Sequence, residues 1–417
     1  MTTVEAETHS VAETEHAGAT PRLGVLPSQA IRDAIHEEWI TAGEFRIPDQ
    51  LVQPASLDLR LGPTAWALRC SFLPDASSTV EDKRAGISYD EIDLRDGATL
   101  ERDRPYLIPL IERLNLPSDV RAKTNPKSST GRLDVFTRVM TDRNNRFDEI
   151  TAGYAGKLYL EVVPRSFAIK VETGVSLNQL RLIRGSVQLS DDEIRHVHSE
   201  HPLLYQGQSA VPGSDLQLSD GLFLSLKIDA LPGAPVGYKA KPNTFPIDLT
   251  SKEPLRTEDF WEHVCAENGK QIVLQPDVFY LLISSEGVSI PPEYAAEMLA
   301  YDPTAGELRT HYAGFFDPGF GYSPGRKRRY GSRAALEVRA RDVPFMVENL
   351  QPVCKLAFER MEAKPDVLYG QGLGSNYQGQ ETMLSKHFAD QTARDGQIPF
   401  ASALDSSGSG GASKGNG

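Results

Sequence analysis

The stretch AGKLYLEVVP (Ala155–Pro164) has a counterpart in SRAALEVRARD (Ser332–Asp342), and this pair determines how the rest of the chain is interpreted. Both stretches alternate apolar and polar residues, which is the pattern of a β-strand with one buried face. Each contains Leu-Glu-Val, so that Glu161 and Glu337 lie 176 positions apart. The match indicates that one structural unit occurs twice.

Two further pairs of segments have nearly the same spacing. RPYLIPLIERLNLPSDVRAK (Arg104–Lys123) and DVFYLLISSEGVSIPPEYAAE (Asp277–Glu297) both read as an aromatic-apolar strand followed by a polar break and an apolar step with proline, and their first tyrosines lie 174 positions apart. The tetrapeptide YQGQ occurs at Tyr205–Gln208 and again at Tyr377–Gln380, which is an offset of 172. These offsets predict an internal duplication with units of roughly 170–200 residues.

The length of 417 residues also favours two domains, because it exceeds what one hydrophobic core usually supports. Short alternating strands with many prolines and glycines predict a mainly β fold, with two tandem distorted, jelly-roll-like β-barrels and few short helices. Helices are expected over Pro27–Ile40, with Ser28 as N-cap, and over Arg256–Asn268. The expected domain map is a disordered tail at 1–22, a first barrel at 23–190, a linker with the first Tyr-Gln-Gly-Gln at 191–220, a second barrel with its own lid at 221–385, and a flexible tail at 386–417.

The composition argues against several classes of protein. A net charge of −13 disfavours binding to nucleic-acid polymers, whose phosphates would be repelled. The chain has no run of 18 apolar residues that could span a membrane, and its acidic N-terminus does not resemble a signal peptide. Cys70, Cys265 and Cys354 lie far apart without a Cys-x-x-Cys pair, which suits a reducing cytoplasm and argues against a structural zinc site.

A polar cluster in NPKSSTGRLDVFTRV (Asn125–Val139) is the first candidate for a ligand site. Ser128, Ser129 and Arg132 place two hydroxyls and a guanidinium within five residues, and Lys127 adds a second cation. Such a set can hold phosphate oxygens through charge-assisted hydrogen bonds. A polar turn with its arginine in solvent is the alternative, because short clusters of this kind are common.

The order of motifs along the first unit resembles that of the dCTP deaminase family, within the trimeric dUTPase-like superfamily. QPASLDLRLG (Gln53–Gly62) matches an early Ser-x-Asp-x-Arg-x-Gly strand, and the Ser-Ser-x-x-Arg segment follows it. An Arg-x-Asp hairpin and a Leu-Glu strand in NRFDEITAGYAGKLYLE (Asn145–Glu161) come next, and Tyr-Gln-Gly-Gln completes the order. The resemblance covers Gly24 to about Gln208 well and about Leu222 to Gln380 more loosely.

This resemblance implies hydrolytic deamination of dCTP to dUTP and ammonia, which would supply dUTP for thymidylate synthesis. Zinc-dependent deaminases carry an H-x-E and a P-C-x-x-C signature, and this sequence has no such cysteine pair. A carboxylate must then activate the water, and the family implies Glu161 as the catalytic base, with Glu337 at the same position of the second unit. Mg²⁺ is expected only as the counter-ion of the nucleotide, and zinc is not expected.

The resemblance also assigns residues that bind the substrate. The hairpin of the first unit departs from the family's Asp-Pro-Gly, whereas GFFDPGFG (Gly314–Gly321) retains it, and Asn376 stands where the family has a lysine. The residues expected to bind the substrate are Lys127, Ser128, Ser129, Arg132, Arg146, Asp148, Asp317, Gln208, Tyr377 and Gln380. In the first unit Asp58 is interpreted as mainly structural.

The second unit has lost its own phosphate cluster, because YDPTAGELR (Tyr301–Arg309) has Pro303 and Glu307 where the serine and arginine should be. The basic run GRKRRYG (Gly325–Gly331) is interpreted as a solvated hairpin tip. Sites could therefore form between like units or between the first and the second unit, and the sequence leaves both open. The resemblance implies threefold packing, and for a chain with two units this is expected to give a homotrimer of three tandem chains.

Two other functions are compatible with the sequence. One is dUTP pyrophosphohydrolase activity, alone or together with deamination, with Asp148 or Asp317 positioning a water against a phosphate. The other is a non-catalytic nucleotide-binding regulator. The loss of the Ser-Ser-x-x-Arg cluster from the second unit is the argument for it.

Overall fold

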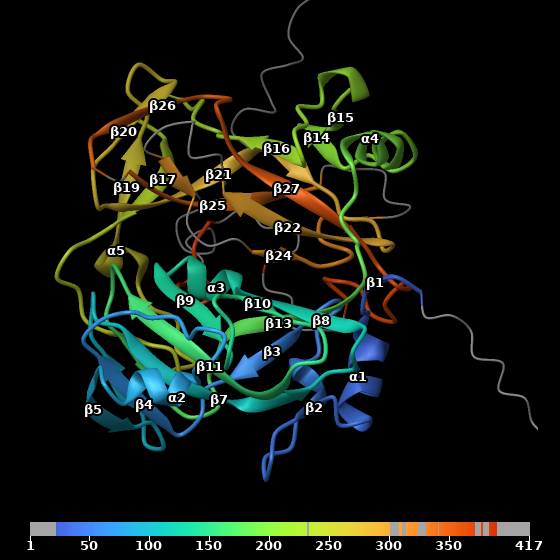
Figure 1. The fold of residues 1–417 in the computed structure, drawn as a ribbon. Coiled ribbons are helices and arrows are strands. Elements are labelled where there is room, and N and C mark those ends of the chain that lie inside the picture. The colour runs from blue at the N-terminus through green and yellow to red at the C-terminus, as the bar shows by residue number, and fades with distance from the viewer. Residues whose placement is uncertain are drawn as a thin grey trace, which may run out of the picture.

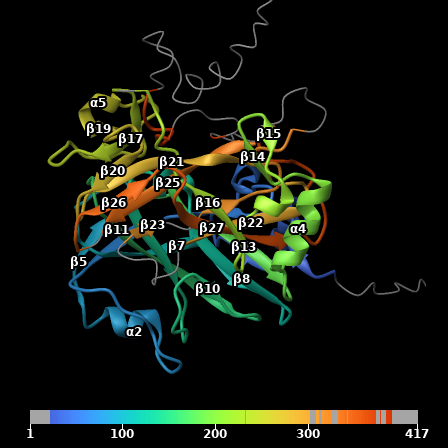
Figure 2. The same cartoon turned by 90° about the horizontal axis from the view of Figure 1, so that it is seen from above.

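The computed structural model describes residues 22–231, 233–300, 308–310, 314–323, 331–340, 342–371, 377 and 383–389. These residues form two β-barrels, the first drawn below the second in Figure 1. The helices α2, α4 and α5 lie at the outer edge of the molecule when it is seen from above in Figure 2.

The first barrel contains β1 (Gly24–Val25), α1 (Ser28–His36), β2 (Ile40–Thr41), β3 (Leu57–Arg60), β4 (Thr64–Leu68), α2 (Val80–Arg84), β5 (Ser88–Asp93), β6 (Ala98–Leu100), β7 (Tyr106–Asn115), β8 (Val120–Pro126), α3 (Ser128–Gly131), β9 (Val135–Met140), β10 (Glu149–Ile150), β11 (Ala155–Pro164), β12 (Ile169–Val171) and β13 (Ser176–Arg184). The second contains α4 (Asp191–Glu200), β14 (Leu204–Gln206), β15 (Ser209–Ala210), β16 (Leu222–Ser225), β17 (Pro235–Ala240), α5 (Thr257–Phe260), β19 (Trp261–Cys265), β20 (Gln271–Leu274), β21 (Phe279–Val288), β22 (Tyr294–Ala300), β23 (Leu308–Thr310), β24 (Phe315–Phe316), β25 (Ser332–Ala340), β26 (Phe345–Glu348) and β27 (Pro352–Arg360). Strand β18 (Ile247–Asp248) follows β17 in the chain but pairs with β12 of the first barrel.

The two barrels repeat one pattern of antiparallel strand pairing. In the first barrel β7 pairs with β11 and β8 with β13, and in the second β21 pairs with β25 and β22 with β27. The pairing of β3 with β13 likewise recurs as β16 with β27. One hydrophobic cluster lies mainly in each barrel. The predicted mainly β fold is confirmed, and the repeated pairing agrees with a tandem duplication.

Polar contacts tie the two barrels together. Glu297 of β22 accepts hydrogen bonds from Lys123 Nζ and Asn125 Nδ2 of β8, both at 3.0 Å. Arg181 of β13 is fully buried and makes an ion pair of 2.7 Å with Glu359 of β27. Buried charges need such partners because they have lost their hydration. These contacts hold the barrels in one relative position, which a site between them requires.

The segment expected to be a linker belongs to the second barrel. Helix α4 begins with a capping box between Ser190 and Glu193 and buries Ile194 in the second hydrophobic cluster. Tyr205 and Gln206 lie in β14, which pairs with β21, and Gly207-Gln208 forms the turn to β15. The first Tyr-Gln-Gly-Gln is therefore a hairpin of the second barrel, and the prediction of a copied lid at 191–220 is wrong.

The two predicted helices are shorter than expected. Helix α1 spans Ser28–His36, with Pro27 at the N-cap position in place of Ser28. The second helix is limited to α5, because the chain from Trp261 onward forms β19 and pairs with β17. Trp261 is buried in the core, so strand pairing and side-chain burial outweigh the local helical pattern.

The segment Met383–Ala389 packs against the barrels, although a flexible tail was predicted from residue 386. Leu255 exchanges backbone hydrogen bonds with it, donating to His387 O and accepting from Ala389 N, both at 2.8 Å. The ring of Phe388 packs edge-on against Phe260 and Trp261, with centroids 5.6 and 5.9 Å away. Within the described part of the chain, no helix is long and apolar enough to cross a membrane.

We expect Phe388→Ala to lower the free energy of unfolding by about 3 kcal/mol, because it removes a buried ring from the aromatic cluster. Urea unfolding followed by tryptophan fluorescence measures this, since Trp261 lies in the same cluster. Phe245→Ala is the matched control, because Phe245 is 86% exposed. Equal unfolding curves for the two variants would show that the segment does not stabilise the fold.

Candidate active site

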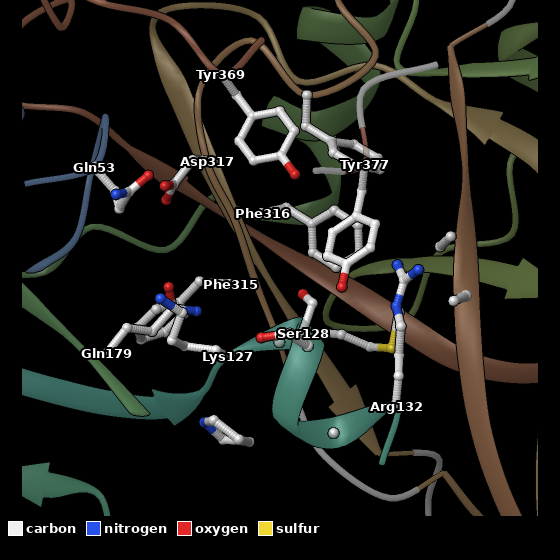
Figure 3. A pocket seen from close by; sticks show the side chains of 18 of the residues that line it. Gln53, Lys127, Ser128, Arg132, Gln179, Phe315, Phe316, Asp317, Tyr369 and Tyr377 are labelled. Atoms are coloured by element: carbon white, nitrogen blue, oxygen red, sulfur yellow. The ribbon is translucent and has the colours of Figure 1, made fainter. Parts of the chain in front are cut away.

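A cavity of about 340 Å³ opens between the two barrels. The first barrel lines it with α3 and residues of β3 and β13, and the second with residues of β24 and β25. Figure 3 shows Ser128 and Arg132 projecting from α3 toward Tyr377, while Gln53, Asp317 and Tyr369 lie across the cavity. The cavity thus depends on segments that are far apart in the sequence.

Helix α3 is a single turn that brings the polar cluster Lys127–Arg132 against the second barrel. Lys127 precedes the helix in an extended conformation and Arg132 follows its last residue, Gly131. A Cβ atom on Gly131 would lie only 2.5 Å from Oε2 of Glu337. A larger residue would displace that carboxyl group, so the position of Glu337 against α3 depends on the absence of a side chain at residue 131.

Glu337 lies on β25, opposite Leu281 of β21, and its carboxyl group faces α3 across the interface. The residue is 8% exposed, and its Oε2 has no hydrogen-bond partner in the described part of the chain. Burial raises the pKa of Glu337 well above its usual value, while the nearby Arg132 opposes the shift and Asp134 adds to it. The result is a carboxyl group that holds its proton more tightly than an exposed glutamate.

Arg132 closes one side of the cavity together with the C-terminal segment. Its guanidinium lies 3.7 Å from the centroid of the Tyr377 ring and donates to the carbonyl oxygens of Met383 and Leu384, at 3.4 and 3.3 Å. Ser385 Oγ donates to Ser129 O at 3.0 Å. A cation on an aromatic face is favourable where water is excluded. Arg132 therefore joins α3 to the segment that follows the second barrel.

Asp317 reaches the cavity from the Asp-Pro-Gly hairpin of the second barrel. Arg181 of the first barrel holds its carboxylate at 3.2 Å and stacks 3.9 Å from the centroid of Phe315, which also lines the cavity. Burial raises the pKa of Asp317, and the Arg181 guanidinium opposes this rise. The wall formed by the second barrel is therefore positioned by an arginine of the first.

The opposite wall carries an ion pair between Lys127 and Asp58. Asp58 lies on β3 and is 6% exposed, so the pair connects that strand to the start of α3. In Figure 3 the side chain of Gln179 is drawn near Lys127, whereas that of Gln53 is drawn beside Asp317; both glutamines line the cavity. The interpretation of Asp58 as structural agrees with this tie, although Asp58 is part of the cavity wall as well.

The cavity brings together most of the residues that were predicted from the sequence. These are Lys127, Ser128, Ser129, Arg132, Asp317, Glu337 and Tyr377. Sequence reasoning missed Gln179, Phe315, Tyr369 and Lys386, which also line it. Phe315 could have been found next to the Asp-Pro-Gly motif, whereas Gln179 lies in an ordinary strand and carries no local signal.

Glu161 is not part of the cavity. It is fully buried on β11, where Oε2 makes an ion pair of 2.6 Å with Arg138 of the neighbouring strand β9. The Arg138 guanidinium lies 3.6 Å from the centroid of Phe147 and also donates to Ser71. The predicted role of Glu161 as the base does not fit this position, because an arginine occupies the space in front of its carboxylate.

The hairpin of the first barrel also lies away from the cavity. Asp148 accepts hydrogen bonds from Thr124 Oγ1 at 2.7 Å and from the Val139 amide at 2.8 Å, so it holds strands together. Arg146 is exposed outside the cavity, and Gln208 is exposed at the β14–β15 turn. These three predicted substrate contacts are not in the cavity, and Gln380 lies outside the described residues.

The described ranges of the chain contain no group of three or more histidine, cysteine, aspartate or glutamate side chains that could hold a metal ion. The ligands that the cavity does offer are hydroxyl, amide, ammonium and guanidinium groups, with three carboxylates.

Comparison with known proteins identifies relatives of both halves. Residues 22–186 match the family model of the 2′-deoxycytidine 5′-triphosphate deaminase N-terminal domain, and residues 190–388 match that of the C-terminal domain. The crystal structure of 2′-deoxycytidine 5′-triphosphate deaminase from Agrobacterium tumefaciens is 44% identical, with a TM-score of 0.78, and the match covers 85% of this chain and 100% of that chain. The match to residues 190–388 agrees with the structure, in which α4 is the first element of the second barrel.

Curated proteins give weaker matches to part of the chain. A dCTP deaminase from Haloarcula marismortui is 26% identical over 172 residues, which is 41% of this chain and 83% of that protein. A protein from Streptomyces avermitilis named "dCTP deaminase, dUMP-forming" is 27% identical over 181 residues, covering 40% of this chain and 85% of its own length. Both matches cover less than half of this chain.

We expect Asp148→Asn to flatten the dependence of stability on pH. Burial raises the pKa of Asp148 from 3.8 to about 7, so the folded state binds its proton more tightly than the unfolded state. The stability from this carboxyl group is then fully present below about pH 4 and is lost as the pH rises through 7. Asparagine keeps an oxygen that can accept from Thr124 and Val139 but carries no charge.

The variant should be more stable than the original protein at pH 8, by roughly 1.4 kcal/mol for each unit by which the pKa is raised. Urea unfolding at pH 5 and pH 8 measures the effect for both proteins. An identical loss of stability between these pH values in both proteins would show that Asp148 does not titrate as stated.

Proposed function

The chain belongs to the dCTP deaminase family, and we propose that its two barrels build one active site between them, with Glu337 as the general base. The chain is an enzyme that deaminates dCTP. The observation that carries the proposal is the contact between Glu337 and Gly131, which puts the raised-pKa carboxyl group of one barrel against the phosphate cluster of the other. Neither barrel alone contains both parts.

The reaction needs one group that moves protons. The Glu337 carboxylate takes a proton from water as the water oxygen bonds to C4 of the cytosine, and it passes this proton to N3. It then takes the hydroxyl proton of the tetrahedral intermediate and gives it to the amino group. Ammonia leaves as the C4 carbonyl forms, so that dCTP and water become dUTP and ammonia.

Burial makes Glu337 suitable for this role. A base is most effective when its pKa lies near the working pH, and a carboxyl group in water is too acidic for that. Desolvation raises the pKa of Glu337, and the Arg132 guanidinium opposes the rise by favouring the carboxylate. Arg132 therefore acts on the proposed general base, Glu337, in addition to the phosphate-binding role inferred from the sequence.

The remaining cavity residues suit the rest of a nucleotide. Lys127, Ser128 and Ser129 suit the binding of phosphate oxygens, because all three line the same cavity and carry an ammonium or a hydroxyl group. Phe315 and Tyr369 offer apolar surface for the base or the sugar, and Asp317 offers a carboxylate for a hydroxyl. Arg181 holds that wall in place through Asp317 and Phe315.

A second activity is hydrolysis of the dUTP product to dUMP and pyrophosphate. The relatives from Streptomyces avermitilis and Parafrankia that are named "dUMP-forming" favour this candidate. An assay that separates dUTP, dUMP and pyrophosphate while following ammonia decides between the two. Accumulation of dUTP supports deamination alone, and dUMP with pyrophosphate supports the bifunctional reaction.

Three features from the sequence remain predictions about the whole enzyme. A homotrimer follows from threefold packing in the superfamily that the sequence resembles. A cytoplasmic location follows from the dispersed cysteines. Catalysis without a resident metal, with Mg²⁺ bound only to the triphosphate, follows from the missing zinc signature.

We expect Glu337→Gln to lower kcat for deamination by about 10²–10⁴-fold, because the amide cannot carry the protons. The affinity for dCTP, measured by titration calorimetry, should change only a few-fold because the shape of the cavity is kept. Glu161→Gln is the matched control, and it should keep kcat while losing stability through the weakened pair with Arg138. Loss of turnover in Glu161→Gln with full activity in Glu337→Gln would reverse the assignment.

Removal of metals tests whether deamination proceeds without a transition metal bound to the protein. After dialysis against a strong transition-metal chelator, kcat should be unchanged once Mg²⁺ is supplied with dCTP. Metal analysis of the protein before dialysis gives the second readout. A stoichiometric transition metal whose removal abolishes turnover would contradict a carboxylate-only mechanism.

A further inference from the structure

Lys386 contributes a third cation to the cavity, from the segment Met383–Ala389 that follows the second barrel. Its side chain lines the cavity together with Lys127 and Arg132. Lys386 is exposed and carries no motif that would mark it in the sequence. Its presence in the cavity wall results from the way this segment folds back onto the first barrel.

The segment holds Lys386 through contacts on both sides of it in the sequence. The Ser385 hydroxyl donates to Ser129 O at 3.0 Å, and the backbone amide of Lys386 donates to the Tyr377 hydroxyl at 3.3 Å. Two residues later Phe388 is buried beside Phe260 and Trp261. Lys386 is thus on an anchored stretch of chain, so its backbone position is defined although its side chain reaches solvent.

The charges around Lys386 are unbalanced. Lys127 is paired with Asp58, and Asp317 is paired with Arg181, whereas no ion pair joins Lys386 to a carboxylate in the described ranges. Partial removal of the Lys386 ammonium from water and repulsion from Lys127 lower the pKa of Lys386, and the Asp58 carboxylate opposes this shift. Burial, Lys386 and Lys127 together lower the pKa of His387 to about 4. An anion placed between the two ammonium groups would relieve this repulsion.

We propose that Lys386 determines the preference for a nucleoside triphosphate, by binding the terminal phosphates while Lys127 and Ser128 bind those nearer the sugar. The proposal rests on the proposed function, because it takes the cavity as the substrate site. Both ammonium groups can form charge-assisted hydrogen bonds to phosphate oxygens. A nucleoside monophosphate has no terminal phosphates at this end and does not use Lys386.

Lys386→Met tests the proposal, because it removes the charge and keeps the length of an exposed side chain. We expect KM for dCTP to rise tenfold or more, with kcat within about threefold, which is the size expected for one charge-assisted contact. The inhibition constants of inorganic tripolyphosphate should rise in parallel, and that of dCMP should not change. Lys386→Arg should restore most of the affinity, since it restores the charge.

Lys157→Met is the matched control, because Lys157 is exposed on β11 and does not line the cavity. It should leave every constant unchanged. Thermal melting of Lys386→Met confirms that the variant is folded. Unchanged KM for dCTP in Lys386→Met, or equal weakening of dCTP and dCMP, would overturn the proposal while leaving deamination by the original protein intact.

The proposed function and this inference fail in different ways. If the original protein does not deaminate dCTP, the proposed function fails, and calorimetric binding of dCTP and of tripolyphosphate then tests Lys386. Weaker binding of both ligands by Lys386→Met would still support a terminal-phosphate contact. Equal binding by the two proteins, or no binding by either, would overturn it.

Discussion

The contact of Glu337 with Gly131 is the constraint on which the site depends. A carboxyl group can lie against the α3 turn only because residue 131 has no side chain and because the barrels are held at one distance. Arg181 and Glu297 maintain that distance through buried polar contacts. The same closeness removes water from the Glu337 carboxyl group and raises its pKa. Packing between the barrels therefore accounts both for the position of the proposed base and for its raised pKa.

The two copies of the duplicated unit have become different in complementary ways. The first barrel keeps the hydroxyls and cations of α3 and its flanks, but its own Glu161 is paired with Arg138, whose guanidinium lies over the ring of Phe147. The second barrel supplies Glu337 and Asp317, which face the first barrel's α3 and Arg181. A single chain therefore contributes both walls of the cavity.

Much of the fold could be predicted from the alternation of apolar residues, because a strand with one buried face leaves a period of two in the sequence. Strands β11 and β25 lie where Leu-Glu-Val had placed them. The tetrapeptide YQGQ was misleading, since Tyr205 lies in a hairpin strand of the second barrel while Tyr377 lies on Arg132. A short polar sequence does not specify its environment, so equal spacing alone could not distinguish coincidence from repetition.

The sequence by itself determined that the chain is a duplicated, mainly β protein. It also supplied the groups available for chemistry, which are a Ser-Ser-x-x-Arg cluster and two candidate carboxylates. These features depend on residue identity and local order, which the chain carries without folding. Only the tertiary structure decided which carboxylate meets the cluster, because Glu161 and Glu337 occupy equivalent strands and differ in what packs against them. Burial, the neighbouring arginines and the placement of Lys386 all arise from contacts between residues that are distant in sequence.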